Sequence, residues 1–327
     1  MFNAIANRIR LIPEQCRILL YEKNNAAVNA LIANIVAVFF VMMTAVFPAF
    51  MTPGRYFTIN FDKTLFLWVS TGTVTLLLFI VLTVLNKKFT VKNYYIDNEP
   101  SRRVALAEWM LLVFIGWAYI SAMVSMFFNP GPRNGRFGGS IVWFGGNGRY
   151  EGFITFLAYA LCFLIIARFY KPKQRHLLLF AGSTILVSLY GVLQFFRIDI
   201  FNLWRWHNHG FYPYPLTIPF RTTIGHVNLI SAYCSFTILL FSVLFCVSRS
   251  KWRYLYLAAS AFSFALSLTV VSGISGDSHR VAILGTMFLL IPYFISNRER
   301  LGRILIVFSS WCLVYAGCSA YLSNAMH

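Results

Sequence analysis

Long apolar stretches recur along this sequence and constrain its fold more than any other feature. A membrane-spanning helix needs about 20 apolar residues. Gly182 and Gly191 interrupt the fifth stretch, and the eighth is short and contains Pro292. We therefore expect an all-α polytopic membrane bundle of about nine transmembrane helices. The nine stretches cover residues 28–51, 64–86, 104–127, 151–169, 176–196, 226–248, 252–273, 279–296 and 303–322.

The composition agrees with a lipid environment. The 327 residues are 58% hydrophobic and only 12% charged, which is too apolar for a soluble chain of this length. The net charge of +18 would suit a nucleic-acid partner, but the basic residues form short clusters between apolar stretches. We therefore expect a lipid bilayer as partner and no nucleic acid. Five of the six cysteines lie inside apolar stretches, which indicates core packing rather than a disulfide framework or a metal site.

Lysine and arginine are unevenly distributed between the two sides of the predicted bundle. The odd-numbered connections, starting with the N-terminal tail, hold 19 of the 28 basic residues. This bias places the N-terminus in the cytoplasm, and nine spans then place the C-terminus outside. The other side holds Arg55, Lys63, Arg133, Arg136, Arg149, Arg197, Arg205, Arg221 and Arg280.

This topology divides the chain into four parts. Residues 1–27 form a cytoplasmic N-terminal segment, and residues 28–127 hold the first three helices. Residues 128–296 form a core whose outer loops are 128–150 and 197–225, and residues 297–327 supply the last helix and a short outer tail. Both outer loops are rich in Gly, Pro, aromatic residues and Arg, as functional loops often are.

Three arginines stand close to predicted outer helix starts, where a cation is normally unfavourable. Arg149 lies in GGNGRYEG, Arg221 in FRTTIGHVN and Arg280 in SGDSHRVA, before or at the fourth, sixth and eighth spans. Helix N-termini combined with arginines form anion sites. A shared phosphate or diphosphate is therefore expected at the outer surface, with lipid-headgroup contacts as the alternative for Arg149 and Arg280.

Further polar residues accompany these arginines. Asn147 or Gly148 is suited to cap the fourth span, which would put Glu151 in its first turn as a helix-dipole carboxylate or as an orienting partner for an arginine. Asn228 lies just inside the sixth span, for interhelical bonding or for substrate contact. Arg136, in the outer loop 128–150, is a further candidate for substrate contact.

Two histidines, His207 and His209, lie in the outer loop 197–225 among several aromatic residues. They are candidate catalytic bases near neutral pH, but interfacial histidines without a chemical role are the more common case. The HxH spacing is also half of a metal site, and Asp199 is the only nearby acidic residue, so we expect no metal. The neighbouring Trp204 and Trp206 suit sugar stacking or an interfacial belt.

Together, GRYEGFITFLAYALCF, RTTIGHVNLISAY and SGDSHRVAILG resemble the O-antigen ligase and polymerase superfamily of bacterial membrane proteins, over about residues 104–296. The resemblance implies glycan transfer from an undecaprenyl diphosphate carrier to a sugar acceptor, at the outer face of the cytoplasmic membrane and without cofactor or metal. It also implies that Arg149, Arg221 and Arg280 bind the diphosphate and stabilise it as leaving group. Asn228 matches the second Asn of the family's Gly-Asn-Pro-Asn turn.

The chain departs from this family in two ways. The turn reads Gly-His-Val-Asn at residues 225–228, so its first Asn is missing. Members usually continue into a large outer loop with a catalytic His, whereas this sequence stops at His327, so an inactive fragment or shortened relative is one alternative to glycan transfer. A transporter or flippase of lipid-linked sugars is the other. A transporter would need ionisable residues near the midplane, but the spans are nearly free of them: Glu108 lies near the cytoplasmic end of the third, and no span has a central charge.

Overall fold

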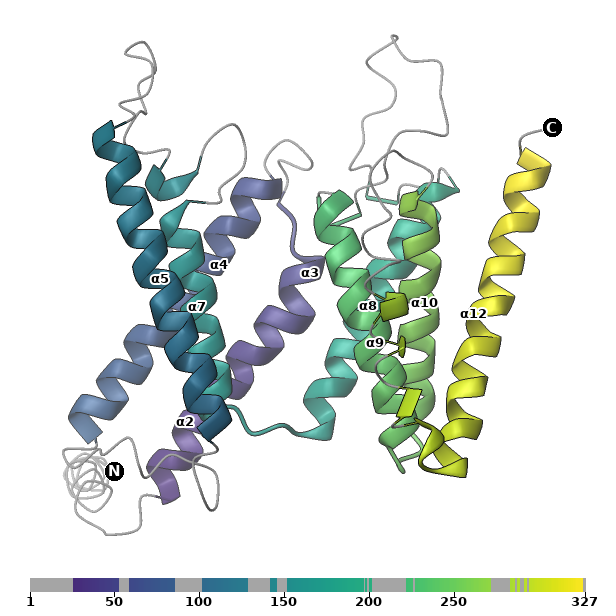
Figure 1. The fold of residues 1–327 in the computed structure, drawn as a ribbon, viewed down its shortest axis with the longest axis horizontal. Coiled ribbons are helices and arrows are strands. Elements are labelled where there is room, and N and C mark those ends of the chain that lie inside the picture. Colours follow the sequence, from purple (N-terminus) through teal and green to yellow (C-terminus); the bar gives the residue numbers. More distant parts are fainter. Residues whose placement is uncertain are drawn as a thin grey trace, which may run out of the picture. The chain divides into compact units, whose positions relative to one another are not determined.

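The structure, a computed structural model, describes most of the predicted spans and few of their connections. The described residues are 26–52, 59–85, 102–128, 142–145, 152–196, 198, 200–201, 222–225, 227–271, 283–285, 287–288, 291–292 and 294–325. Helices are the only regular elements among them (Figure 1). They are α2 (Ala26–Val41), η1 (Met42–Val46), α3 (Phe47–Ala49), α4 (Ile59–Ile80), η3 (Val81–Leu85), α5 (Arg102–Phe128), α7 (Phe153–Phe169), α8 (Gln174–Phe195), α9 (Val227–Val247), α10 (Arg253–Val271) and α12 (Arg298–Ala325).

Six segments are long and apolar enough to cross a membrane. α7 is apolar but shorter, at 17 residues. The expected multi-pass helical membrane protein is therefore confirmed. The count of nine and the inside–outside topology stay predictions, because α7 and α10 are not among the six segments and much of the eighth stretch lies outside the described residues. The six spans are Ala30–Ala49, Ile59–Thr83, Leu106–Ser125, Gln174–Phe195, Leu229–Val247 and Arg298–Ala320.

Large apolar side chains are exposed on these helices. Along α5, Trp109, Val113 and Trp117 are 67%, 69% and 71% exposed, and they recur every four residues on one face. A water-soluble protein rarely exposes such a continuous apolar patch. Lipid hydrocarbon accommodates such a patch without cost. The exposed apolar face of α5 is therefore typical of a membrane helix, although little of the helix surface is buried.

The chain forms two compact units, of which the first combines residues 1–40 with residues 64–172. Within it, the Trp68 indole N–H donates to the Thr155 hydroxyl at 3.1 Å, which joins α4 to α7. The Arg168 guanidinium at the end of α7 donates to both carboxylate oxygens of Glu108 in α5, at 2.8 and 2.6 Å. Because Glu108 is 5% exposed, this pair supplies the counter-charge that a buried carboxylate requires.

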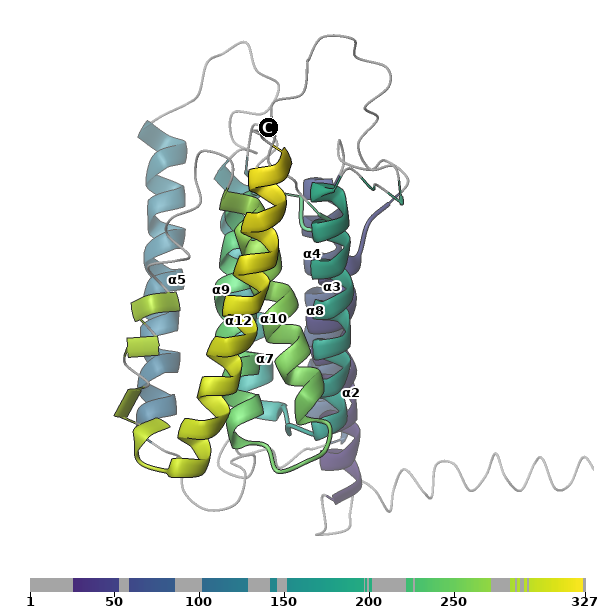
Figure 2. The same cartoon turned by 90° about the vertical axis from the view of Figure 1, so that its right-hand side faces the viewer.

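The second unit combines residues 41–63 with residues 173–327. Its core lies between α8, α9 and α10, which lie side by side, and α12 packs on α9 and α10 (Figure 1; Figure 2). Fully buried side chains such as Phe241 and Leu266 fill this core. Gly182 and Gly191 do not interrupt α8, which is continuous from Gln174 to Phe195, so that expectation was wrong.

Small hydroxyl side chains connect the helices of the second unit. Thr237 of α9 donates to Ser263 of α10 at 3.0 Å, and the Ser242 and Ser260 hydroxyls are 2.9 Å apart. The Trp311 indole N–H of α12 also donates to Ser260, at 3.2 Å. Buried hydroxyls need such partners in a medium without water, so these bonds fix how the three helices meet.

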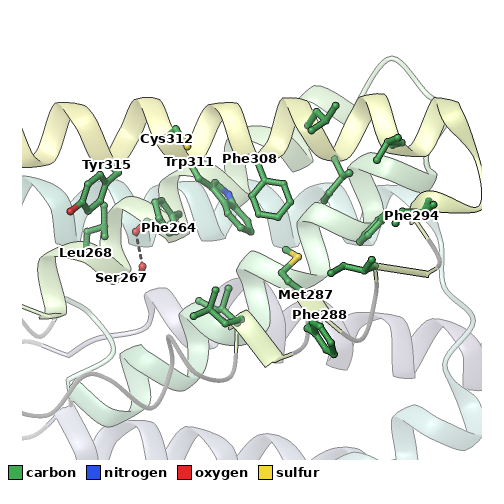
Figure 3. Close-up of a pocket in the computed structure, with 17 residues that line it drawn as sticks. Phe264, Ser267, Leu268, Met287, Phe288, Phe294, Phe308, Trp311, Cys312 and Tyr315 are labelled. Carbon is green, nitrogen blue, oxygen red and sulfur yellow. Dashed lines mark hydrogen bonds between the residues drawn. The ribbon is translucent and has the colours of Figure 1, made fainter.

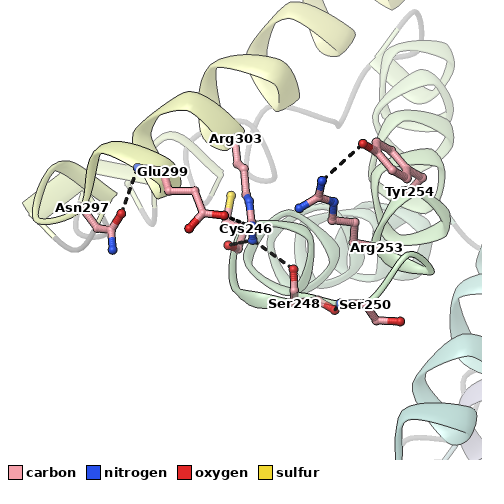
Figure 4. A network of polar contacts seen from close by, with 8 residues as sticks. All are labelled: Cys246, Ser248, Ser250, Arg253, Tyr254, Asn297, Glu299 and Arg303. Carbon is pink, nitrogen blue, oxygen red and sulfur yellow. Dashed lines mark hydrogen bonds and ion pairs between the residues drawn. The ribbon is translucent and has the colours of Figure 1, made fainter.

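Arg303, in the second turn of α12, caps the C-terminal end of α9. Its guanidinium donates to the carbonyl oxygens of Cys246 and Ser248 at 2.8 and 2.9 Å, and it pairs with Glu299 one turn earlier (Figure 4). The last carbonyls of a helix have no partner within the helix and carry partial negative charge. Arg303 satisfies both needs at once.

Candidate functional site

Most of the predicted site residues lie outside the part of the chain that the structure describes. Asn228 belongs to the first turn of α9, but nothing is described of its side chain. Their proposed roles therefore stay predictions. The residues outside are Arg136, Arg149, Glu151, His207, His209, Arg221 and Arg280.

The predicted start of the fourth span needs a correction. α7 begins at Phe153 with Gly152 as its N-cap, so Asn147 and Gly148 do not cap it and Glu151 is not in its first turn. A Cβ atom on residue 152 would lie 2.3 Å from the carbonyl oxygen of Trp143. Only glycine allows this close approach, and α7 begins directly after it.

The described residues nearest in sequence to the predicted arginines form a turn at residues 222–225, directly between Arg221 and α9. All four residues are buried. Thr222 has a φ of 47° and Gly225 a φ of 91°. A left-handed conformation is costly for a β-branched residue such as threonine, and it persists only where the surroundings hold it.

Two side chains of α8 hold this turn from one side. The backbone N–H of Thr222 donates to the side-chain oxygen of Gln194 at 3.1 Å, and the Gln194 amide nitrogen donates to the Tyr190 hydroxyl at 2.9 Å. Within the turn, the backbone N–H of Ile224 donates to the Thr222 hydroxyl at 3.0 Å. Since Gln194 and Thr222 are both 2% exposed, these bonds replace water for every polar group involved.

The break in the first membrane helix holds the turn from another side. The Thr223 hydroxyl donates to the carbonyl oxygen of Pro48 at 2.7 Å. The same carbonyl accepts a bond of 3.1 Å from the ammonium of Lys63, which also donates to the carbonyl of Phe47 at 2.6 Å. The helix ends at Ala49, so the carbonyl groups of Phe47 and Pro48 lie in its last turn and remain available to these donors.

Two glycines permit the close packing around the turn. A Cβ atom at Gly191 would lie 2.4 Å from the Thr222 methyl carbon, and one at Gly225 would lie 2.7 Å from a side-chain carbon of Ile59. Gly191 was predicted to interrupt a span, but it instead admits the side chain of Thr222. The 222–225 turn is thus held by α8, by the start of α4 and by the end of α3.

Lys63 is the residue that sequence reasoning misplaced. The second span was predicted to start at residue 64, which left Lys63 in an outer connection. α4 instead begins at Ile59, and Lys63 is 6% exposed within its second turn. The local signal was a lysine directly before an apolar stretch and after a Pro-containing break, but its acceptors lie 15 and 16 residues earlier.

A cavity of about 860 Å³ opens between α10, α12 and the described helical residues 283–285, 287–288, 291–292 and 294–295 (Figure 3). Its lining is almost entirely apolar and includes Phe264, Met287, Phe288 and Trp311. The described residues that line it include no charged side chain, so they offer nothing that would bind a phosphate.

The described side chains form a support rather than a reaction centre. The residues that the structure describes contain no group of three or more His, Cys, Asp or Glu suited to hold a metal ion. The 222–225 turn instead fixes the backbone between Arg221 and the N-terminus of α9. Chemically, such an arrangement is able to present backbone donors and a neighbouring cation to an anion.

No family model, curated protein or solved structure matches this chain. What the fold establishes is the class: a multi-pass helical membrane protein.

Proposed function

We propose that this protein transfers a glycan from a polyprenyl-diphosphate carrier to a sugar acceptor at the outer face of a bacterial cytoplasmic membrane. The observation that carries this proposal is the buried 222–225 turn between Arg221 and α9, in which Thr222 and Gly225 have a left-handed backbone. A helix N-terminus beside an arginine favours a phosphate group. A backbone fixed before the ligand arrives loses no further freedom on binding, which strengthens such a site.

In this reaction, an acceptor hydroxyl attacks the anomeric carbon of the donor sugar, and the bond from that carbon to the diphosphate oxygen breaks. The diphosphate leaves on its carrier and gains charge, which Arg149, Arg221 and Arg280 would stabilise together. Asn228, Glu151 and Arg136 are proposed to contact the substrate. The hydroxyl proton passes to a base, for which His207 and His209 are the candidates.

The proposal needs nine spans with the N-terminus in the cytoplasm, which would bring the three arginines to the outer face. The Glu108–Arg168 ion pair supports this arrangement locally, because it joins the start of α5 to the end of α7. Two spans that follow one another must run antiparallel in this way. Reporter fusions after residues 172 and 325 test the whole topology, with a cytoplasmic signal expected for the first and an outer signal for the second.

Transport of a lipid-linked sugar is the second candidate, and Lys63 is the observation that favours it. A buried cation within a membrane helix is a common mark of a substrate path. Lys63, however, lies in the second turn of α4 rather than near its centre, and its ammonium is engaged by two carbonyl groups. Transfer therefore remains the better supported function.

The deciding experiment measures binding and transfer with a purified, labelled polyprenyl-diphosphate oligosaccharide. We expect Arg221→Ala, Arg149→Ala and Arg280→Ala each to weaken donor binding about 10-fold or more, since a charge-assisted hydrogen bond contributes about 1.5–3 kcal/mol. Arg205→Ala is the matched control, because Arg205 lies in the outer loop 197–225 away from a predicted helix start.

Three results would contradict the transfer proposal. The first is that the wild-type protein does not bind the donor at all. The second is an equal loss of binding in Arg205→Ala, which would mean that only general positive charge matters. The third is movement of the intact labelled donor across a liposome membrane without cleavage of its sugar–phosphate bond, which would establish transport.

A further inference from the structure

Lys63 carries a buried charge that no described carboxylate neutralises. The two ion pairs among the described residues join Arg168 to Glu108 and Arg303 to Glu299. The neighbouring Asp62 accepts a hydrogen bond from Thr52 instead. A buried ammonium without an anionic partner is costly, so a membrane protein retains one where it has a task.

The surroundings of Lys63 indicate what that task is. Two of its three protons go to the carbonyl oxygens of Phe47 and Pro48, and its ammonium lies 4.9 Å from the centre of the Phe47 ring. All these partners belong to α3, whose last carbonyls carry partial negative charge. With its protons directed at α3, Lys63 is not arranged to bind a substrate anion itself.

We propose that Lys63 is a positioning residue, which holds the 222–225 turn through the carbonyl group of Pro48. That carbonyl accepts from both Lys63 and Thr223, at 3.1 and 2.7 Å. The ammonium fixes the direction of the Pro48 carbonyl, and the carbonyl in turn fixes Thr223. Two hydrogen bonds that share the Pro48 carbonyl oxygen thus connect Lys63 to the turn between Arg221 and α9.

The shared acceptor makes the lysine difficult to replace. Without the ammonium, the Phe47 and Pro48 carbonyls at the end of α3 lose donors, and the peptide groups are free to rotate toward other partners. Thr223 would then lose a fixed acceptor while Thr222 still has Gln194. The turn would therefore loosen at one side without unfolding of α8, α9 or α10.

The consequence for a ligand rests on the proposed function. If a diphosphate binds beside Arg221 and the start of α9, a looser turn lowers its affinity because order must be restored on binding. The link between Lys63 and the turn does not need that ligand. The two statements are therefore tested by separate measurements on the same purified protein in detergent.

The first measurement is hydrogen–deuterium exchange of the backbone amides at residues 222–225. We expect Lys63→Met, which keeps much of the length and removes the charge, to raise their exchange rate about 10-fold by local opening. Lys63→Arg retains a cationic donor and should restore slow exchange. Thr237→Val is the matched control, because it removes a buried bond between α9 and α10 that does not touch the turn.

The second measurement is the affinity for farnesyl diphosphate, with farnesol as the uncharged control ligand. We expect Lys63→Met to weaken diphosphate binding about 10-fold, at a thermal midpoint no lower than that of Thr237→Val. Farnesol binding should not change. If Lys63 has a purely structural role, Lys63→Met should instead lower the thermal midpoint and should not weaken farnesyl diphosphate binding more than farnesol binding.

Each outcome decides one of the two statements. Unchanged exchange at residues 222–225 in Lys63→Met would overturn the positioning role, and so would an equal rise in Thr237→Val. Faster exchange in a protein whose wild type binds no farnesyl diphosphate would uphold the positioning role and reject the proposed function. Faster exchange together with selectively weaker diphosphate binding supports both.

Discussion

The side-chain oxygen of Gln194 accepts the backbone N–H of Thr222, 28 residues later, at 3.1 Å in a fully buried environment. This bond ties the C-terminal end of α8 to a residue with a φ of 47°. Within the turn, the Thr222 hydroxyl accepts from the backbone N–H of Ile224, whereas the backbone N–H of Thr222 itself donates to Gln194. Gln194 is therefore what keeps the strained residue satisfied.

Replacement of Gln194 by leucine should destabilise the protein and release the turn. The Thr222 N–H would stay buried without an acceptor, at a cost of about 1–3 kcal/mol. Thermal unfolding in detergent measures the loss, and amide exchange at residues 222–225 locates it. A turn that exchanges as slowly in Gln194→Leu as in the wild type would show that the bond is dispensable.

Two glycines of α8 should respond in opposite directions to alanine. Gly191→Ala places a Cβ atom 2.4 Å from side-chain atoms of Thr222 and Leu266, and such overpacking costs about 1–3 kcal/mol. A Cβ atom added at Gly182 would meet no neighbouring atom within 4 Å. Gly182→Ala should therefore raise stability by up to about 1 kcal/mol, through helix propensity alone.

The pair of melting curves provides its own control, since both substitutions add one methyl group to the same helix. Equal shifts of the thermal midpoint would contradict the close packing of Thr222 against Gly191.

Removal of one partner of the Glu108–Arg168 pair should destabilise the first unit strongly. Glu108→Gln leaves the guanidinium with a weaker acceptor, and loss of one partner from a buried pair costs about 3 kcal/mol at the low end, because Arg168 is one-third exposed. Thermal unfolding of the single variants and of Glu108→Gln combined with Arg168→Met gives the coupling energy as a double-mutant cycle.

The exposed pair between Glu299 and Arg303 is the comparison for this cycle. Glu299 is 68% exposed and one helical turn from its partner, so Glu299→Gln should cost no more than about 0.5 kcal/mol. If the coupling energy between Glu108 and Arg168 is as small as this, their ion pair is screened by water as much as the exposed pair is.

Arg303→Met should loosen the contact between α12 and the end of α9. The Cys246 and Ser248 carbonyls would lose a charged donor, and bonds to charged groups contribute about 1.5–3 kcal/mol. Protease cleavage at residues 248–252 should become faster in this variant. Arg298→Met is the control, because Arg298 is exposed in the first turn of the same helix. Equal cleavage of the two variants would reject the capping role.

The apolar stretches alone sufficed to predict a multi-pass helical membrane protein, because hydropathy over about 20 residues is a local property. They also located most helices to within a few residues. The exceptions are α4 and α12, which both begin five residues before their predicted starts, because the first turns from Ile59 and from Arg298 contain polar or charged residues. The arginines near the outer helix starts were equally visible in the sequence, and their joint site stays a prediction.

Only the tertiary structure decided which polar residues support the turn beside Arg221. The sequence analysis predicted that Lys63 lies in a connection and that Gly191 interrupts a helix. Both predictions considered only the neighbouring residues in the sequence. Their roles depend on Pro48 and Thr222, which approach them through packing of distant helices. Burial and hydrogen-bond geometry arise from such long-range contacts, and no local pattern of hydropathy or charge contains them.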